Sequence, residues 1–163
     1  MNVFDYFFEF TSGLDKDFLL GKESISFREL YSTSLTLAHR IREQVGEAKN
    51  IMLIAPNNLF FLQSYLAILK SGNICIPLDP EIEIENIEYI AHITKPNLIF
   101  TTNEVERRLP VDNFEKRNPG NLFFDEHKDY IKIQPEFFDS ENFAEIIFTS
   151  GSTGIPKGVM ISH

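Results

Sequence analysis

The fold of this protein is decided by residues 51–80, which read IMLIAPNNLFFLQSYLAILKSGNICIPLDP. The unbroken apolar run over Ile51–Ala55 predicts a strand that is buried on both faces. A Pro-Asn-Asn turn closes this run, and the wide apolar set over Leu59–Lys70 predicts a helix that is covered on several sides. A Ser-Gly pair ends the helix, and a second buried strand is expected over Ile74–Pro77. Strand, helix and strand joined by short turns are typical of a parallel sheet.

The chain on either side of this unit continues the pattern. Downstream, the sequence predicts an acid-led helix over about Glu83 to Thr94 and another strand over Leu98–Thr101. Upstream, Ser26 and Glu29 form a capping-box pattern ahead of apolar positions at helical spacing. Aromatic residues near the N-terminus predict a short helix that lies on the body as a lid. We therefore expect an α/β fold with an open, mostly parallel sheet and helices on its faces.

Composition and charge restrict what the chain can be. Its 163 residues suffice for one well-buried domain, and 43% of them are apolar, which excludes disorder. A net charge of -9 argues against nucleic acid as a partner. The single cysteine, Cys75, cannot form an intramolecular disulfide, and no apolar run is long enough to cross a membrane. We expect a cytoplasmic protein without a membrane span.

The region from Asn103 to Ser140 carries the weakest signal. It is polar, charged and interrupted by prolines. Two short apolar runs, Leu122–Phe124 and Tyr130–Ile133, are its strand candidates.

A segment rich in hydroxyls and glycines lies between two apolar, β-rich runs near the end of the sequence. This segment, Thr149–Gly158, reads TSGSTGIPKG, and we call it the phosphate loop. Its side-chain hydroxyls, its glycines and Lys157 are the groups needed to surround a polyphosphate. No acidic residue follows Glu145, so the local charge favours an anion. The sheet is therefore expected to end in a strand, phosphate loop and strand.

The P-loop of nucleotide triphosphatases is the obvious alternative, because it needs a glycine, four residues, and then Gly-Lys followed by Ser or Thr. Gly151 and Lys157 have the required separation. However, Pro156 stands at the position of the second glycine, and Gly158 stands at the position of the hydroxyl that binds magnesium. The β-branched run that follows favours a strand over a helix. These three departures exclude the P-loop.

The phosphate loop instead resembles that of the adenylate-forming (AMP-binding) superfamily. This superfamily includes acyl-CoA synthetases, adenylation domains of peptide synthetases, fatty-acyl-AMP ligases and luciferases. Residues 69–80, LKSGNICIPLDP, are similar to its second core motif, which is a helix end, a glycine, a strand and a Pro-Leu-Asp turn. Residues 25–30, ISFREL, are similar to the first core motif, with Phe27 where the family usually has Tyr. The three motifs follow one another in the family's order.

The resemblance implies roles for named residues. The β- and γ-phosphates of ATP would be wrapped by Thr149, Ser150, Gly151, Ser152, Thr153 and Gly154, with Lys157 contributing to the same loop. Donors aimed at these oxygens stabilise the charge that develops on departing pyrophosphate. The resemblance also implies ATP and Mg²⁺, a small carboxylic acid as substrate, and CoA or the phosphopantetheine of a carrier protein as acceptor. Catalytic residues and metal ligands are expected outside 1–163, since in this family they lie downstream of the phosphate loop.

These implications lead to an expected function. The chain is expected to be the N-terminal portion of the large domain of an acid:thiol ligase, without the rest of that domain or the small C-terminal domain. A start at Met1 with no preceding domain favours an acyl-CoA ligase. The alternatives are an adenylation domain that activates an amino acid for a carrier protein, and a truncated, non-catalytic anion-binding or interaction module. Alone, residues 1–163 are expected to be inactive and to self-associate through uncovered apolar surface.

Several other side chains have simpler interpretations. Cys75 lies in an apolar run and is expected to be inert core. Lys157 has the alternative of being an ordinary solvated strand lysine. The histidines show no metal-ligand spacing among themselves; they are His39, His92, His127 and His163. The aromatic residues of the 59–70 helix are interpreted as core; they are Phe60, Phe61 and Tyr65.

Overall fold

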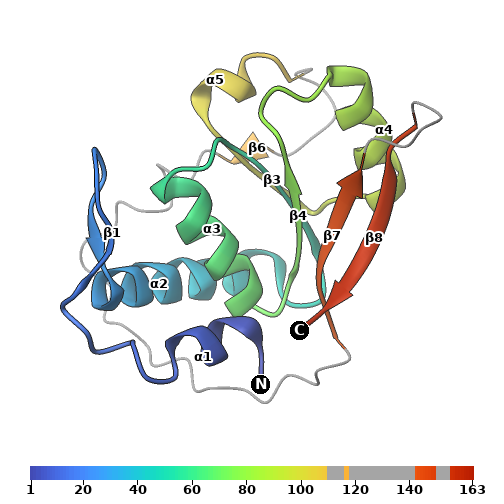
Figure 1. Ribbon diagram of the computed structural model, residues 1–163. Coiled ribbons are helices and arrows are strands. Elements are labelled where there is room, and N and C mark those ends of the chain that lie inside the picture. The colour runs from blue at the N-terminus through green and yellow to red at the C-terminus, as the bar shows by residue number, and fades with distance from the viewer. Residues whose placement is uncertain (110–115, 118–141, 150–154) are drawn as a thin grey trace.

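The computed structural model of the 163-residue chain describes residues 1–109, 116–117, 142–149 and 155–163. Its main feature is a six-stranded sheet with the order β6-β5-β3-β4-β7-β8 (Figure 1). The strands of this sheet are β3 (Asn50–Ile54), β4 (Ile74–Leu78), β5 (Leu98–Thr101), β6 (Lys116–Arg117), β7 (Phe143–Thr149) and β8 (Lys157–Ser162). All neighbouring pairs are parallel except β7 and β8, which are antiparallel. The predicted open, mostly parallel α/β fold is confirmed.

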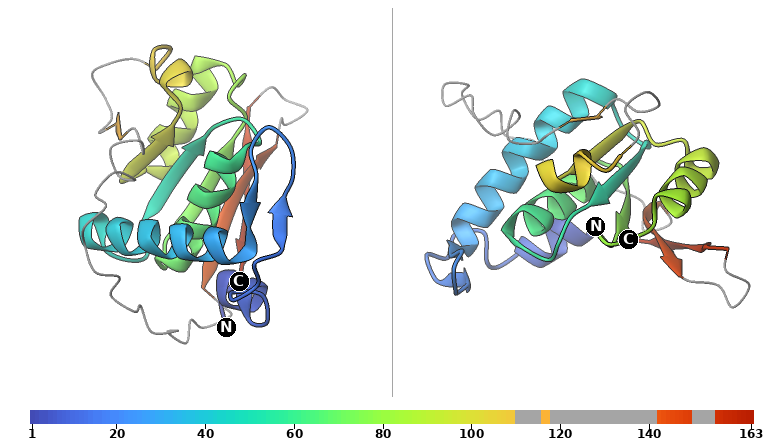
Figure 2. Two further views of the ribbon diagram at one scale, coloured as in Figure 1. Left: turned by 90° about the vertical axis from the view of Figure 1, so that its left-hand side faces the viewer. Right: turned by 90° about the horizontal axis from the view of Figure 1, so that it is seen from above.

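Helices cover both faces of this sheet, as Figure 2 shows from above. The helices are α1 (Val3–Phe8), α2 (Phe27–Val45), α3 (Leu59–Lys70), α4 (Ile84–Thr94) and α5 (Asn103–Glu106). Alternate residues of β3 point to opposite faces, as strand geometry requires. Ile51 and Leu53 pack in one core cluster with residues of α2 and α3, whereas Met52 and Ile54 pack in a second with residues of α4. The central strand is buried on both faces because both faces are covered.

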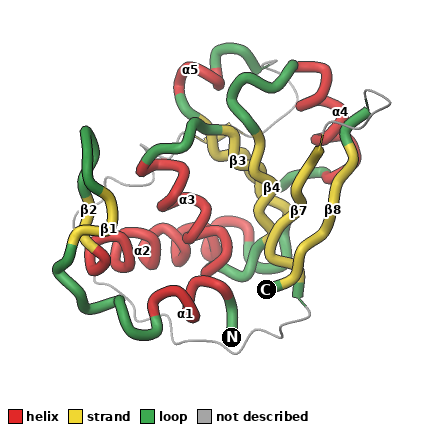
Figure 3. Tube along the Cα trace, viewed as in Figure 1, coloured by secondary structure: helices red, strands yellow, loops and turns green. Residues whose placement is uncertain are grey.

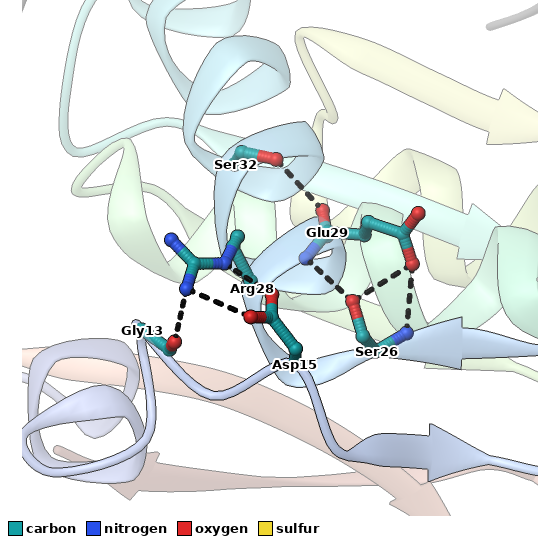
Figure 4. Close-up of polar contacts among 6 residues, drawn as sticks. All are labelled: Gly13, Asp15, Ser26, Arg28, Glu29 and Ser32. Carbon is teal, nitrogen blue, oxygen red and sulfur yellow. Dashed lines mark hydrogen bonds and ion pairs between the residues drawn. The ribbon is translucent and has the colours of Figure 1, made fainter.

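The capping box predicted at the start of α2 is present (Figure 4). The backbone N–H of Glu29 donates to the Oγ of Ser26 at 3.2 Å, and the N–H of Ser26 donates to the Oε2 of Glu29 at 2.9 Å. Next to it, Arg28 binds the carboxylate of Asp15 and the carbonyl of Gly13. A small hairpin of β1 (Asp17–Leu19) and β2 (Ile25–Ser26) leads into the helix, and both strands are too short to leave a sequence pattern.

The N-terminal helix α1 belongs to a third core cluster. Phe4 and Phe8 are buried and pack with Leu30 of α2 and Leu66 of α3. The helix predicted near the N-terminus is therefore present, and it contributes side chains to the core as well as covering it. In Figure 3, α1, α2 and α3 lie together beside the strands.

The distribution of apolar surface agrees with the cover expected for α3. All large apolar side chains of this helix are buried or half-buried, because α1 and α2 both pack on it. Among the apolar residues that are exposed, three are consecutive on β8, namely Val159, Met160 and Ile161. This strand forms one edge of the sheet.

Two further expectations concern elements and membrane association. The strand candidates Leu122–Phe124 and Tyr130–Ile133 lie outside the described residues. Within the described part of the chain, none of the helices combines the length and apolar character that a membrane crossing requires.

Candidate functional site

The parallel strands define where a ligand is expected. Because β3, β4, β5 and β7 run in one direction, their carboxyl ends share one edge of the sheet, which we call the carboxyl edge. The connection after β3 leads through α3 to β4, and the connection after β5 leads to β6 on the other side of β3 in the sheet. Ligands of open α/β sheets bind outside the carboxyl ends of two adjacent strands whose connections diverge in this way. Those strands are β3 and β5, and β7 lies at the same carboxyl edge, beyond β4.

Strands β7 and β8 bring two of the predicted site residues together at this edge. Thr149 ends β7 and Lys157 begins β8, and the two residues are direct cross-strand partners. Side chains of directly opposed residues lie on the same face of a sheet. Both residues are exposed, so a hydroxyl and a cation face solvent side by side. The remaining predicted residues, Ser150, Gly151, Ser152, Thr153 and Gly154, lie outside the described residues.

Gly158 has a packing role that the sequence did not reveal. It lies opposite Phe148, whose ring covers it. A Cβ at this position would lie 3.0 Å from Cζ of Phe148 and 3.1 Å from Cγ2 of Ile146. The glycine of the Pro-Lys-Gly sequence therefore makes room for the aromatic ring and joins the two strands close to the loop.

The second motif, residues 69–80, builds the support for β4. Gly72 has a φ of 77°, which favours glycine. The next residue, Asn73, is fully buried, and its Oδ1 accepts from the Lys49 N–H at 2.9 Å. Its Nδ2 donates to the carbonyl of Gly46 and to the Oγ of Ser71, both at 2.9 Å. The asparagine thus fixes the start of β4 to the turn before β3, at the edge of the sheet opposite the carboxyl edge.

The Pro-Leu-Asp turn of the same motif lies at the carboxyl edge. The Oδ1 of Asp79 accepts from the N–H of Glu81 at 2.7 Å, which closes the turn after β4. Arg108 donates to the carbonyl of Pro80 at 2.6 Å and to the carbonyl of Ile82. These bonds hold the turn against the segment that follows α5.

One carboxylate lies in the strand that leads to the phosphate loop. The Oε2 of Glu145 accepts a hydrogen bond from the hydroxyl of Tyr65 at 3.1 Å. Burial raises the pKa of Tyr65, and the charge of Glu145 raises it further. Cys75 lies opposite Glu145 in β4, and complete burial, with the same carboxylate nearby, raises the pKa of its thiol. The thiol therefore stays protonated, in agreement with its expected place in the core.

The described residues offer no evident metal centre. Among them, no group of three or more His, Cys, Asp and Glu side chains is arranged to hold a metal ion.

Taken together, the fold and the β7–β8 hairpin define an open α/β unit, and the sequence that joins β7 to β8 at its carboxyl edge is rich in hydroxyls and glycines. The chain belongs to the AMP-binding enzyme family, whose sequence profile matches residues 11–163.

The chain spans less than a third of the length of the two curated relatives described next. The chain is 33% identical over 154 residues to the dimodular nonribosomal peptide synthase of Bacillus subtilis (strain 168), covering 86% of this chain and 6% of that protein. It is 36% identical over 143 residues to the D-alanine--D-alanyl carrier protein ligase of Bacillus cytotoxicus, covering 85% of this chain and 28% of that protein. The N-terminal subdomain of Klebsiella oxytoca NpsA, in complex with 3-hydroxybenzoyl-AMSN, shares the fold with a TM-score of 0.81 at 21% identity. That match covers 99% of this chain and 41% of the NpsA chain.

Proposed function

We propose that this chain is the N-terminal portion of the large domain of an ATP-dependent carboxylic acid:thiol ligase. Such an enzyme joins the acid to AMP, releases pyrophosphate, and passes the acyl group to a thiol. Family membership supports the reaction class. The observation that carries the proposal is the position of Thr149 opposite Lys157 at the carboxyl edge of the sheet, the edge at which open α/β sheets bind ligands.

The residues at the mouth of the hairpin fit a phosphate group. The Lys157 ammonium supplies positive charge, and the Thr149 hydroxyl supplies a donor on the same face. In the proposed site, Ser150, Gly151, Ser152, Thr153 and Gly154 complete the phosphate loop around the β- and γ-phosphates of ATP. When bound, Mg²⁺ would neutralise phosphate charge, and its ligands are proposed to lie outside this chain. Hydrogen-bond donors that are already in position before the reaction stabilise the negative charge on pyrophosphate as it departs.

The nature of the acid and of the acceptor thiol forms a finer part of the proposal. The similar proteins include a nonribosomal peptide synthase and a D-alanine--D-alanyl carrier protein ligase. Their names support an amino acid as the substrate and the phosphopantetheine of a carrier protein as the acceptor. We therefore place this alternative ahead of the acyl-CoA ligase that the sequence favoured. CoA remains the second candidate acceptor.

A pyrophosphate titration of the 163-residue chain, followed by backbone amide NMR, tests the phosphate site. We expect the amides of residues 149–158 to shift, with a dissociation constant on the order of millimolar, because contacts to adenine and ribose are absent. Lys157→Ala should weaken binding several-fold and make the remaining affinity less sensitive to salt. Lys49→Ala is the matched control, since Lys49 is an exposed lysine just before β3, at the opposite edge. Amides that stay unmoved at roughly tens of millimolar would contradict the proposed site.

An exchange assay tests the extent of the catalytic unit. We expect residues 1–163 alone to show no carboxylate-dependent exchange of labelled pyrophosphate into ATP, because positioning of the reacting groups supplies much of the rate acceleration. Exchange above the background of a chain-free sample would show that these residues already contain an adenylation site. If the chain is instead a non-catalytic anion-binding or interaction module, the same absence of exchange is expected. A reading frame that ends at residue 163 would favour that alternative.

A further inference from the structure

The strand that leads into the phosphate loop contains an extra residue. Phe143 lies opposite Ser162, but Glu145 lies opposite Ile161, so β7 advances two residues while β8 advances one. This irregularity is a β-bulge at Ala144. Because of it, two consecutive residues face the same side of the sheet. Ala144 packs in the core cluster that contains residues of α2 and α3, and Glu145 reaches Tyr65 of α3.

The bulge sets the direction of every side chain between it and the loop. Beyond the bulge, Ile146 and Phe148 pack against the cluster on the α4 side. Alternation then places Ile147 and Thr149 on the α3 side, together with Glu145. A β7 strand that pairs without the bulge but keeps Ala144 in the core would turn Thr149 to the opposite side.

The apolar residues of β7 do not select between these two arrangements. Ile146, Ile147 and Phe148 follow one another, so an apolar side chain faces each side of the sheet in either case. The pairing of Phe148 with Gly158 aligns β7 with β8, but it does not align the hairpin with α3. Glu145 is the ionisable residue of β7, and the reversed arrangement would turn its carboxylate toward the apolar cluster of α4. A carboxylate without a donor in such a place is strongly disfavoured.

We propose that Tyr65 is a positioning residue, which holds Glu145 on the α3 side, fixes the bulge at Ala144, and so directs Thr149, together with its cross-strand partner Lys157, to the α3 side of the sheet. The alignment of β7 rests on described contacts alone. Its consequence for phosphate binding rests on the proposed function. Tyr65 itself touches no ligand in this arrangement, because its hydroxyl donates to Glu145 four residues before the loop mouth.

The proposal is tested by NMR of the 163-residue chain carrying Tyr65→Phe. In the unmodified chain, cross-strand contacts should join residue 143 to 162 and residue 145 to 161, as in the structure. Tyr65→Phe keeps the ring and removes the donor, so we expect a second set of resonances for residues 144–149. The ratio of bulged to unbulged chains should fall about tenfold, the effect of losing one hydrogen bond to a charged group. A single set of resonances with unchanged contacts would overturn the proposal.

Three further variants separate a positioning role from general destabilisation. Glu145→Gln keeps an oxygen that accepts from Tyr65 and should retain the single bulged set. Glu145→Ala removes the carboxylate but leaves the tyrosine ring in place, and it should produce the second set even if Tyr65→Phe unfolds. Tyr31→Phe changes another half-buried tyrosine, on α2, and should leave β7 unaffected. A second set in Glu145→Gln or Tyr31→Phe, or none in Glu145→Ala, would contradict the proposed role.

A pyrophosphate titration of Tyr65→Phe distinguishes this proposal from the proposed phosphate site. Resonances of the bulged set should shift with pyrophosphate, while those of the second set stay in place. If both sets shift alike, the bulge does not position the loop mouth, and the positioning role is overturned. If neither set shifts, and the unmodified chain does not respond either, the phosphate site fails while the alignment of β7 by Tyr65 stands.

Discussion

The Nζ of Lys70, at the end of α3, lies 2.7 Å from the Oδ1 of Asp5 in α1, and this ion pair is almost completely withdrawn from water. The side chain of Lys70 is 3% exposed and that of Asp5 is 17% exposed. The same ammonium lies 5.6 Å from the centre of the Phe4 ring. Lys70 belongs to the second sequence motif, and its role in the described structure is to hold the N-terminal helix against the core.

Removal of one partner of this ion pair should destabilise the fold strongly. Asp5→Ala leaves the Lys70 ammonium buried without its counter-charge, and we expect the free energy of unfolding to fall by about 3 kcal/mol. Urea denaturation followed by circular dichroism measures this change. Asp17→Ala, which removes an exposed aspartate in β1, is the control and should change stability by less than about 0.5 kcal/mol. Equal effects of the two variants would show that the ion pair contributes nothing specific.

Asn73 should contribute almost as much to the stability of the fold as this ion pair, although it lies at the edge of the sheet opposite the proposed phosphate site. Asn73→Leu preserves much of the volume but leaves the N–H of Lys49 and the carbonyl of Gly46 without their side-chain partner. We expect a loss of about 2 kcal/mol in unfolding free energy, measured by the same denaturation experiment. Asn97→Leu, at an exposed position just before β5, serves as the matched control. Stability unchanged by Asn73→Leu would refute this assignment.

His163 should make the stability of the chain depend on pH. Its Nδ1 accepts from the N–H of Val3 at 3.4 Å, and burial together with the positive N-terminus lowers the pKa of its imidazole. A base whose pKa is lower in the folded state contributes its full stability above the unfolded pKa, about 6.5. That contribution is then lost as the pH falls through the folded pKa. Unfolding free energy should therefore decrease on going from about pH 7.5 to about pH 5.5.

Variants at two histidines isolate this effect. His163→Gln removes the titrating group and should make the decrease smaller. His92→Gln, at an exposed position of α4, should leave the decrease as it is in the unmodified chain. An identical pH dependence in all three proteins would rule out His163 as its origin.

The exposed strand β8 should cause the chain to self-associate. Val159 is 54% exposed and Ile161 is 38% exposed, and β8 forms one edge of the sheet in the described part of the chain. Apolar edge strands pair with further strands, and a second copy of the chain offers one. Light scattering should show a mass above 18.8 kDa that rises with concentration. Val159→Lys should reduce this association, whereas Leu20→Lys, at another exposed apolar residue, should not. A constant monomeric mass at high concentration would contradict the prediction.

The elements of the fold could be predicted wherever they depend on neighbouring residues. The apolar run predicted as a strand over Ile51–Ala55 appears as β3 at Asn50–Ile54, displaced by one residue. The capping box of Ser26 and Glu29 formed as expected because both partners lie within one helical turn. Of the candidate site, the sequence identified Thr149 and Lys157 as members of one loop, and the structure places them at the ends of β7 and β8 as cross-strand partners. The assignments of residues 150–154 remain predictions.

The sequence by itself determined the class of fold, the order of the elements from α2 to β5 and the segment proposed to bind phosphate, because each of these is encoded in periodicity or in contiguous residues. Only the tertiary structure decided the contacts that hold this segment in place. Lys70 meets Asp5 across 65 positions, and Tyr65 meets Glu145 across 80. The bulge at Ala144 depends on β4, β8 and α3 together. Such contacts form only when distant segments are packed side by side, so no local pattern of residue types specifies them.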